Sequence, residues 1–264
     1  MRENRLRQLL NDGAPSIGTH IHSMWPSIVE AVGHTGMFDY VEFVAEYAPF
    51  DLFSMDNFCR AVELFDMSSM IKIDQEPRGF LAQRGIGAGF QSVLFADSRS
   101  AQDVRDCVRL CRPDTPEDGG THGANSRRFT YRSMAYGGAA EHVQAVRDVV
   151  VVAMIEKKAA VDELDEILEI DGLDMIQWGP SDFSMSIGRP GERGVPEVQA
   201  AERRVFESAL KAGVQPRAEI DSVDGAKRFL DMGVRHFCMG TDISILFDWW
   251  KTNGDSLRKA ISDA

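Results

Sequence analysis

Apolar runs and amphipathic segments alternate along the whole chain. Eight short apolar runs are typical of buried strands, and we expect strands at Ile17–Ile21, Tyr40–Val44, Met70–Ile73, Gln91–Phe95, Val149–Ile155, Met175–Trp178, Val214–Arg217 and His236–Met239. Apolar residues at helical spacing predict helices between them, at Pro26–Val32, Asp56–Phe65, Arg78–Gly85, Ala101–Cys111, Ala159–Ile170, Pro196–Ala212, Val223–Met232 and Ile243–Ile261. Eight strand–helix units in 264 residues predict a (β/α)8 TIM barrel, formed as a single domain over residues 1–264. A doubly wound sheet is the alternative, but no GxGxxG motif follows the first expected strand.

One segment interrupts this alternation. Residues 112–142 are rich in Gly, Pro, Arg and Tyr, and they predict a long loop after the fourth strand–helix unit. A long loop in a compact domain is usually functional or disordered. We therefore expect a lid over the end of the barrel or a subunit contact, with a passive insertion as the alternative.

The composition is that of a soluble globular protein, with 44% hydrophobic and 27% charged residues. A net charge of −12 argues against nucleic acid or an anionic membrane surface as partner, because phosphate binding needs a basic field. No apolar run approaches the roughly 20 residues that span a membrane. The four cysteines contain no CxxC pair, so we expect reduced thiols and a cytoplasmic location.

Two acidic residues follow consecutive expected strands. Glu156 comes directly after the run Val149–Ile155, and Asp182 follows Met175–Trp178 and a Gly-Pro turn. Two parallel strands joined by one helix form a right-handed unit, so their C-terminal ends lie side by side. Two converging carboxylates can hold a hard divalent cation such as Mg²⁺. The alternative is that both residues are helix caps or loop acids.

Other polar side chains also fall at the expected strand ends, where TIM barrels carry their active sites. They are His20, His22, Glu42, Tyr47, Lys72, Asp74, Arg217 and Glu219. Such a set costs stability when buried unless every group is paired. Structural alternatives are core packing of the histidines and of Tyr47, and ion pairs of Lys72 with Asp74 or Glu42 and of Arg217 with Glu219.

Three stretches carry a resemblance to a known family. Residues 179–188 read Gly-Pro-Ser-Asp-Phe-Ser-Met-Ser-Ile-Gly, close to Gly-Pro-Ser-Asp-Leu-Ser-x-Ser-Leu-Gly of the HpcH/HpaI (4-hydroxy-2-oxoheptanedioate) aldolases, which are metal-dependent class II pyruvate aldolases. Ile155-Glu156 fits the Gln-Ile-Glu of that family. Phe38-Asp39-Tyr40 and Ala45-Glu46-Tyr47-Ala48-Pro49 fit its Phe-Asp … Glu-His-x-Pro. The chain resembles this family from about Ile17 to Ile245.

The resemblance implies a TIM barrel that is often hexameric. Its last helix would pack on a neighbouring subunit or be swapped with it, so we expect a homo-oligomer, either a hexamer or a trimer. The resemblance also implies that Glu156 and Asp182 hold a divalent ion, which would be Mg²⁺, Mn²⁺ or Co²⁺. A 2-oxo acid would chelate this ion, and backbone groups at Gly179, Pro180 and Ser181 would bind its carboxylate. An aldehyde would be the second substrate.

The chain departs from the family at the positions that act on the substrate. The strand-two histidine of the family, the usual base partner, is Tyr47, and its strand-three arginine is Lys72. Lysine cannot reproduce a bidentate guanidinium, and tyrosine, with an ordinary pKa of about 10, is a poor base at neutral pH. We hypothesise that His20 or His22 serves as the base and that Arg217 supplies the missing guanidinium contact.

Three classes of function are compatible with this pattern. The first is a metal-dependent carbon–carbon lyase, an aldolase that acts on a 2-oxo acid through a pyruvate-type enolate. The second is a divergent enzyme that uses the same metal site to decarboxylate or hydrolyse another carboxylated substrate. The third is a non-catalytic barrel, against which the presence of both Glu156 and Asp182 argues.

Overall fold

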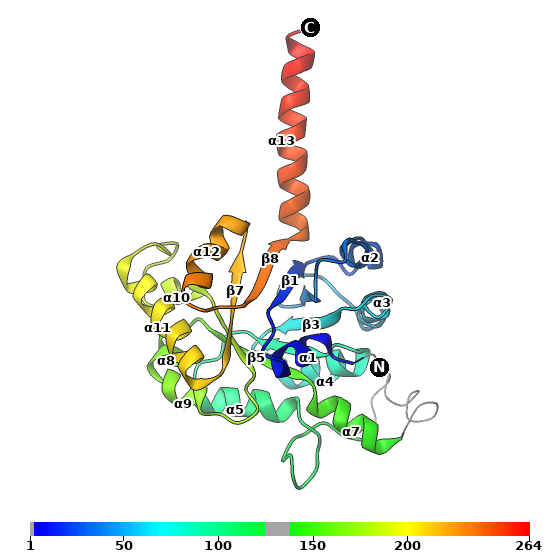
Figure 1. Ribbon diagram of the computed structural model, residues 1–264, viewed down its shortest axis with the longest axis vertical. Helices are drawn as coiled ribbons and strands as arrows, with labels where there is room; N and C mark the ends of the chain where they lie inside the picture. The colour runs from blue at the N-terminus through cyan, green and yellow to red at the C-terminus, as the bar shows by residue number, and fades with distance from the viewer. Residues whose placement is uncertain (1–2, 125–137) are drawn as a thin grey trace.

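Eight parallel strands close into a barrel in the order in which they occur along the chain (Figure 1). They are β1 (Ser16–Ile21), β2 (Tyr40–Val44), β3 (Ser68–Ile73), β4 (Ser92–Phe95), β5 (Val150–Ile155), β6 (Met175–Trp178), β7 (Gln215–Ile220) and β8 (His236–Thr241). This computed structural model describes residues 3–124 and 138–264. Every expected strand overlaps one of the observed strands, and the predicted (β/α)8 TIM barrel is confirmed.

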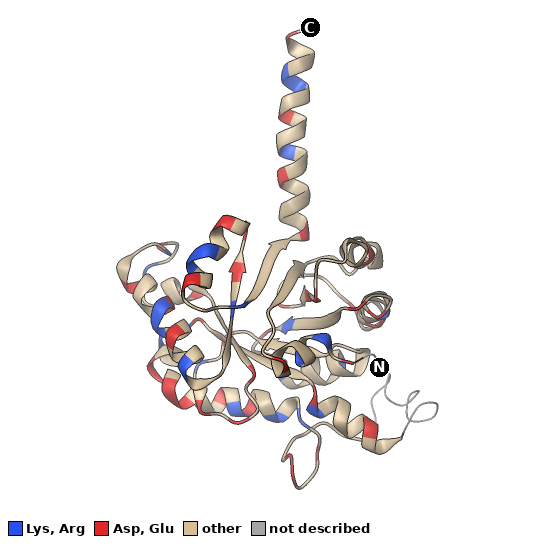
Figure 2. Ribbon diagram, in the orientation of Figure 1, with Lys and Arg blue, Asp and Glu red and all other residues tan. Residues whose placement is uncertain are grey.

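Helices lie around the barrel, and most of them connect successive strands. In the described residues they are α1 (Arg5–Asn11), α2 (Pro26–Thr35), α3 (Leu52–Val62), α4 (Arg78–Ala88), α5 (Ala101–Leu110), α7 (Ala139–Arg147), α8 (Lys158–Asp162), α9 (Leu164–Leu168), α10 (Pro180–Ser186), α11 (Pro196–Ala212), α12 (Val223–Asp231) and α13 (Asp242–Ser262). Charged residues are spread over these outer helices, with an acidic excess around α8 and α9 (Figure 2). None of the helices in the described ranges is long and apolar enough to span a membrane.

The helix prediction differs from the structure in several places, and the short helices α1 and α10 lie outside every expected range. The single helix expected at Ala159–Ile170 is divided into α8 and α9 at Glu163, whose carboxylate accepts a hydrogen bond from the Ala101 N–H. The helix α7 was not expected at all. It buries only His142 and Val146, so its sequence carries a weak apolar pattern.

The segment 112–142, expected to be a long loop, lies partly outside the described residues, which leave out 125–137. The last residues of the predicted loop belong instead to helix α7, which begins at Ala139. The described parts connect α5 to β5, so they lie at the N-terminal end of the strands. This position does not favour the expected lid, because the polar strand ends are on the opposite side of the barrel.

The inside of the barrel is divided into an apolar and a polar end. Near the N-terminal ends of the strands, the inward side chains pack with Leu6 of α1, and they are Tyr40, Met70, Leu94, Val150, Val152 and Met175. Helix α1 closes this end, and the Asn4 side chain donates hydrogen bonds to the carbonyls of Gln91 and Asp148. The inward polar residues therefore gather at the other end, which we call the mouth, where the strands end and the loops after them begin.

The last helix, α13, projects away from the barrel at the mouth (Figure 1). Its first residue, Asp242, is attached to the segment after β1. The Asp242 carboxylate accepts hydrogen bonds from the backbone N–H groups of His22 and Ser23. Beyond it, the large apolar side chains are exposed, namely Ile243, Ile245, Phe247, Trp249, Trp250, Leu257 and Ile261. An exposed apolar surface of this extent marks an interaction site.

Candidate active site

Glu156 is a buried carboxylate at the mouth, directly after β5. Its Oε1 accepts a 2.7 Å hydrogen bond from the backbone N–H of Asp97. Asp97 has φ of 55°, a left-handed conformation that a residue other than glycine rarely adopts, and this conformation turns its N–H toward Glu156. Burial raises the pKa of Glu156 to about 7, although the Asp97 N–H and the Lys72 ammonium lower it.

Gly179 and Asp182 lie close to Glu156 at the start of α10. A Cβ atom on Gly179 would come within 2.5 Å of Glu156 Oε2, so only glycine leaves room for this carboxylate. Asp182 lies in the first turn of α10, and its side chain is about half exposed at 48%. Its negative charge also raises the pKa of Glu156, which places the two carboxylates in one electrostatic site.

The two carboxylates fit a hard divalent cation. Oxygen ligands from one or two acidic side chains, with positions left for water and substrate, are the usual protein contribution to a Mg²⁺ site. Glu156 is buried, and its raised pKa means that its negative charge is poorly compensated by the neighbouring groups. A cation between Glu156 and Asp182 would supply that compensation.

Lys72 and Tyr47 form a second polar group at the mouth. The Lys72 ammonium lies 2.6 Å from Glu46 Oε2 and donates a 2.9 Å hydrogen bond to the Tyr47 hydroxyl. Burial opposes the charged form of Lys72, but Tyr47 and Glu46 outweigh it and raise the pKa of the ammonium. Burial also raises the pKa of Tyr47, against the effect of Lys72, so the phenol stays protonated. The ion pair of Lys72 is thus with Glu46 rather than with Asp74 or Glu42.

His20, on β1, lies between two carboxylates. Its Nε2 is 3.3 Å from Glu42 Oε1 and 3.2 Å from Glu219 Oε1. Burial alone would lower the pKa of His20, but Cys238, Glu42 and Glu219 together raise it well above its ordinary value. The imidazole of His20 is therefore protonated at neutral pH.

The pKa of His22 is shifted in the opposite direction from that of His20. Burial lowers its pKa, and the positive charge of His20 lowers it further, against the attraction of Asp242. Its ring lies edge-on to the ring of Tyr47, with 5.9 Å between centroids. At neutral pH His22 is therefore an uncharged imidazole beside the ring of Tyr47.

Arg217 lies below these groups and is fully buried. Its Nε donates a 2.7 Å hydrogen bond to the Tyr40 hydroxyl, another nitrogen is bonded to Gln177 Oε1, and the third forms an ion pair with Glu42. Gly18 makes room for this arrangement, because a Cβ there would come within 2.2 Å of the Tyr40 ring. The geometry does not favour the expected contact of Arg217 with substrate, and its ion pair is with Glu42 rather than with Glu219.

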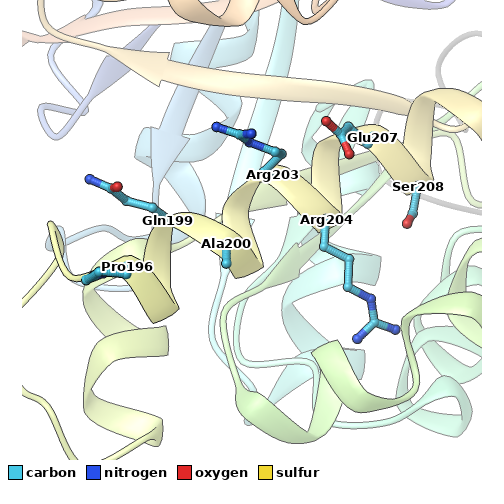
Figure 3. A pocket seen from close by; sticks show the side chains of 7 residues that line it. All are labelled: Pro196, Gln199, Ala200, Arg203, Arg204, Glu207 and Ser208. Carbon is cyan, nitrogen blue, oxygen red and sulfur yellow. The ribbon is translucent and has the colours of Figure 1, made fainter.

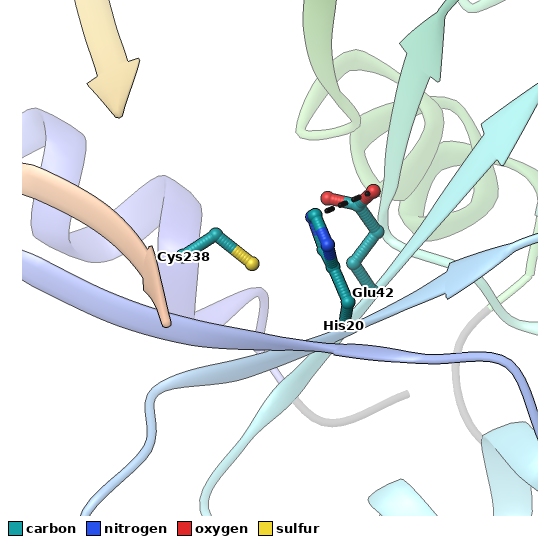
Figure 4. Close-up of side chains that lie close together, drawn as sticks. All are labelled: His20, Glu42 and Cys238. Carbon is teal, nitrogen blue, oxygen red and sulfur yellow. Dashed lines mark ion pairs between the residues drawn. The ribbon is translucent and has the colours of Figure 1, made fainter. Parts of the chain in front are cut away.

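A different set of possible metal ligands also occurs in the barrel. His20, Glu42 and Cys238 each offer a donor atom within 4.8 Å of the others (Figure 4). The Glu42 carboxylate already faces the Arg217 guanidinium, and His20 lies between Glu42 and Glu219. The negative charge of this cluster is thus compensated by protein groups, whereas that of Glu156 is not, so we favour Glu156 and Asp182.

A shallow pocket of about 400 Å³ lies on the outer surface, away from the mouth (Figure 3). Its walls come from α11, through residues that include Arg203, Arg204 and Glu207. The two arginine side chains point away from each other in Figure 3, so they do not converge on one anion. We therefore place the chemistry at the mouth.

The structure brings most of the predicted site residues together. Glu156, Asp182 and the Gly179–Ser181 turn share one side of the mouth, and Tyr47, Lys72 and His22 are linked by direct contacts. The sequence did not point to Lys157, whose Nζ bonds Asp182, although its position directly after Glu156 was a usable signal. It also gave no reason to connect Cys238 with His20, because β8 and β1 meet only when the barrel closes.

The structure is a TIM barrel that places two carboxylates at the ends of β5 and β6, an arrangement that suits a divalent cation. Residues 17–248 match the model of the HpcH/HpaI aldolase/citrate lyase family, and the chain belongs to this family. The resemblance inferred from the motifs is thereby confirmed. Family membership also confirms, at the level of the family, the prediction of an aldolase-type carbon–carbon lyase.

Individual relatives agree with this assignment. The chain is 26% identical over 243 residues to a hydroxypyruvate/pyruvate aldolase of Paraburkholderia phytofirmans, covering 91% of this chain and 92% of the relative. It is 25% identical over 245 residues to a 4-hydroxy-2-oxo-heptane-1,7-dioate aldolase of Escherichia coli, covering 92% and 91%. The crystal structure of an HpcH/HpaI aldolase from Desulfitobacterium hafniense superposes with a TM-score of 0.86 at 23% identity, covering 96% of each chain.

Proposed function

We propose that the protein is a divalent-metal-dependent aldolase, which makes or breaks a carbon–carbon bond next to a 2-oxo acid through a pyruvate-type enolate. The observation that carries the proposal is the buried Glu156 carboxylate beside the Gly179 turn that leads to Asp182. Relatives named as pyruvate, hydroxypyruvate and 4-hydroxy-2-oxo-heptane-1,7-dioate aldolases support the substrate class.

Glu156 and Asp182 would hold the cation, which is Mg²⁺, Mn²⁺ or Co²⁺. When bound, such an ion supplies Lewis-acid polarisation of the 2-oxo acid. Glu156 is rigidly placed by the Asp97 N–H, whereas Asp182 is more exposed and adjustable. This difference suits a site in which one ligand is fixed and the other closes on the ion.

The start of α10 would bind the carboxylate of the 2-oxo acid. The N–H of Gly179 is already bonded to the Ile155 carbonyl, and Pro180 has none. The N–H groups of Ser181 and Asp182 lie in the first helical turn, where backbone donors have no partner within the helix. These two donors, with the nearby Lys72 ammonium, would neutralise the substrate carboxylate, and Gly179 and Pro180 would shape the turn.

His22 is the better candidate for the general base. The base has to take a proton from the C4 hydroxyl during cleavage and return it during condensation, which requires an uncharged imidazole at neutral pH. The lowered pKa of His22 meets this requirement, and the raised pKa of His20 makes His20 a proton donor instead. The protonated Tyr47 hydroxyl would donate a hydrogen bond to the oxygen that develops negative charge.

Arg217 would act as a positioning residue. Its ion pair fixes Glu42, and Glu42 in turn contacts His20 Nε2. This arrangement keeps the His20 imidazolium in place without any contact between Arg217 and substrate.

A product assay tests the proposal. The protein would be stripped with chelator, reloaded with Mn²⁺ and incubated with a 4-hydroxy-2-oxo acid, while pyruvate, aldehyde and CO₂ are measured. We expect pyruvate and aldehyde in equal amounts. The rate of their formation should depend on Mn²⁺ and should be at least about a hundredfold lower in Glu156→Gln. Release of CO₂ and an aldehyde without pyruvate would show decarboxylation instead, and product formation that Glu156→Gln leaves unchanged would place the chemistry elsewhere.

The exposed helix α13 supports a homo-oligomer, a hexamer or trimer, in which α13 packs on or is swapped with a second copy. A pocket of about 590 Å³ at its base is lined by Gly240, Ile243, Ile245 and Phe247. Light scattering would give the mass of the wild type and of a variant with Phe247, Trp249 and Trp250 changed to Ser. We expect an oligomeric wild type and a smaller variant, and a monomeric wild type would contradict the assignment.

We also propose a cytoplasmic location. All four cysteines are buried, and none of them forms a disulfide. Reduced thiols are usual in the cytosol, where disulfides are rare.

A further inference from the structure

Lys157 links two acidic residues at the mouth. Its Nζ lies 2.9 Å from Asp97 Oδ1 and 2.9 Å from Asp182 Oδ1. The side chain is only 17% exposed, so the ammonium lies within the site and does not extend into solvent. Lys157 therefore binds one of the carboxylate oxygens that we assign as ligands of the divalent cation.

Lys157 also belongs to the same local structure as Glu156. It follows Glu156 directly, and Asp97, which it binds, donates its backbone N–H to Glu156 Oε1. The second oxygen of Asp97 is held by Arg99 at 2.9 Å. Asp97 thus keeps a cationic partner whether or not Lys157 stays in place, whereas Asp182 has Lys157 as its ion-pair partner among the described residues.

We propose that Lys157 is a built-in counter-cation that competes with the divalent metal for Asp182 and sets the metal affinity of the site. The inference rests on the proposed function, because it takes Glu156 and Asp182 as the ligands. In the metal-free protein the ammonium neutralises Asp182 and Asp97. When the metal binds, Lys157 gives up Asp182 Oδ1 and keeps its contact with Asp97 Oδ1.

The positive charge of Lys157 opposes the binding of a second cation. A dication bound to Asp182 lies close to the position that the Lys157 ammonium occupies, and the two repel each other in a partly buried site. The metal also has to replace an ion pair that is already formed. Both effects weaken metal binding, so removal of the lysine charge strengthens it.

Mn²⁺ titration of the full-length, chelator-stripped protein tests the inference, with free Mn²⁺ followed by electron paramagnetic resonance. The variants are Lys157→Met and Lys157→Gln, two neutral replacements that protect the test against a folding defect in either one. Lys158→Met is the matched control, because Lys158 is the next residue, is more than half exposed and pairs only with Asp162 among the described residues.

We expect Kd for Mn²⁺ to fall roughly tenfold in both Lys157 variants and to stay at the wild-type value in Lys158→Met. An unchanged or higher Kd in the Lys157 variants would overturn the inference, because Lys157 would then merely position Asp182. Asp182→Asn separates a failure of the proposed metal site from a failure of the proposed role of Lys157. If it still binds Mn²⁺ like the wild type, the metal site itself is wrong, and if it loses Mn²⁺ while Lys157 has no effect, only this inference fails.

Discussion

Arg217 and Glu42 form an ion pair inside the barrel, with both side chains fully buried. The pair lies one layer below the mouth, with the Tyr40 hydroxyl and Gln177 as further partners of the guanidinium. Separating two charges in such a place is costly, because the remaining charge stays buried without a partner. The pair therefore fixes the geometry of Glu42 and, through it, of His20.

Removal of the Arg217 charge should destabilise the protein strongly. We expect Arg217→Met to lower the free energy of unfolding by about 3–5 kcal/mol, measured by urea denaturation. The double variant Glu42→Gln, Arg217→Met should lose less than the sum of the single changes, because neither charge is then left alone. Lys158→Met, which breaks an exposed pair with Asp162, is the control and should change stability by less than about 1 kcal/mol.

The pKa of Glu156 predicts a pH dependence of stability. The folded protein keeps this proton up to about pH 7, whereas the unfolded chain releases it near the ordinary pKa of 4.5. Folded molecules thus hold more protons between these values, and the free energy of unfolding of the metal-free protein falls as pH rises from 4.5 to 7. We expect Glu156 to contribute up to about 3 kcal/mol to this fall.

Glu156→Gln isolates this contribution, because the amide does not titrate. The difference in unfolding free energy between the variant and the metal-free wild type should grow in favour of the variant as pH rises to 7. A difference that is flat with pH would mean that the pKa of Glu156 is the same in the folded protein as in the unfolded chain. Mn²⁺ should reverse the trend in the wild type, because a bound cation favours the ionised carboxylate.

The two histidines of β1 and its following loop should titrate in opposite directions. Carbon-13 NMR of labelled imidazoles should show His22 uncharged and His20 protonated at pH 7. The raised pKa of His20 also stabilises the fold below its ordinary pKa, and this contribution is lost as pH rises through the raised value. A neutral His20 at pH 7 would remove the argument for His22 as the base.

The closeness of Gly179 to Glu156 gives a steric prediction. Gly179→Ala would place a methyl group 2.5 Å from Glu156 Oε2, and it should weaken Mn²⁺ binding at least tenfold while the barrel stays folded. Gly194→Ala is the matched control, since an added Cβ there has no heavy atom within 4 Å among the described residues. Calorimetric titration with Mn²⁺ compares the two variants, and equal affinities would show that Glu156 does not bind the ion.

The barrel could be predicted from the sequence because short segments rich in apolar residues, of which β5 is the clearest, alternate with segments of helical periodicity. The positions of Glu156 and Asp182 followed from the same logic, since residues after parallel strands share one end of the sheet. Helix α7 could not be found in this way, because it buries only two side chains.

The pairing of the charged residues was harder to predict. The sequence suggested Arg217 with Glu219, but the closed barrel brings β7 and β2 together across its interior and pairs Arg217 with Glu42. Glu219 is left for His20 and Gln177. The pairing of the inward acids with the cations depends on the distance across the closed barrel and on the lengths of the side chains. The spacing of these residues along the sequence does not give that distance.

The most direct test of the account is proton exchange of pyruvate. The protein would be stripped with chelator, reloaded with Mg²⁺ or Co²⁺ and held with pyruvate in D₂O, while NMR follows the methyl signal. We predict metal-dependent loss of the methyl protons that disappears in Glu156→Ala and in Asp182→Ala. If the reloaded protein binds metal yet exchanges no protons, or if the two variants exchange as fast as the wild type, the assignment of an enolate-forming site to Glu156 and Asp182 is wrong.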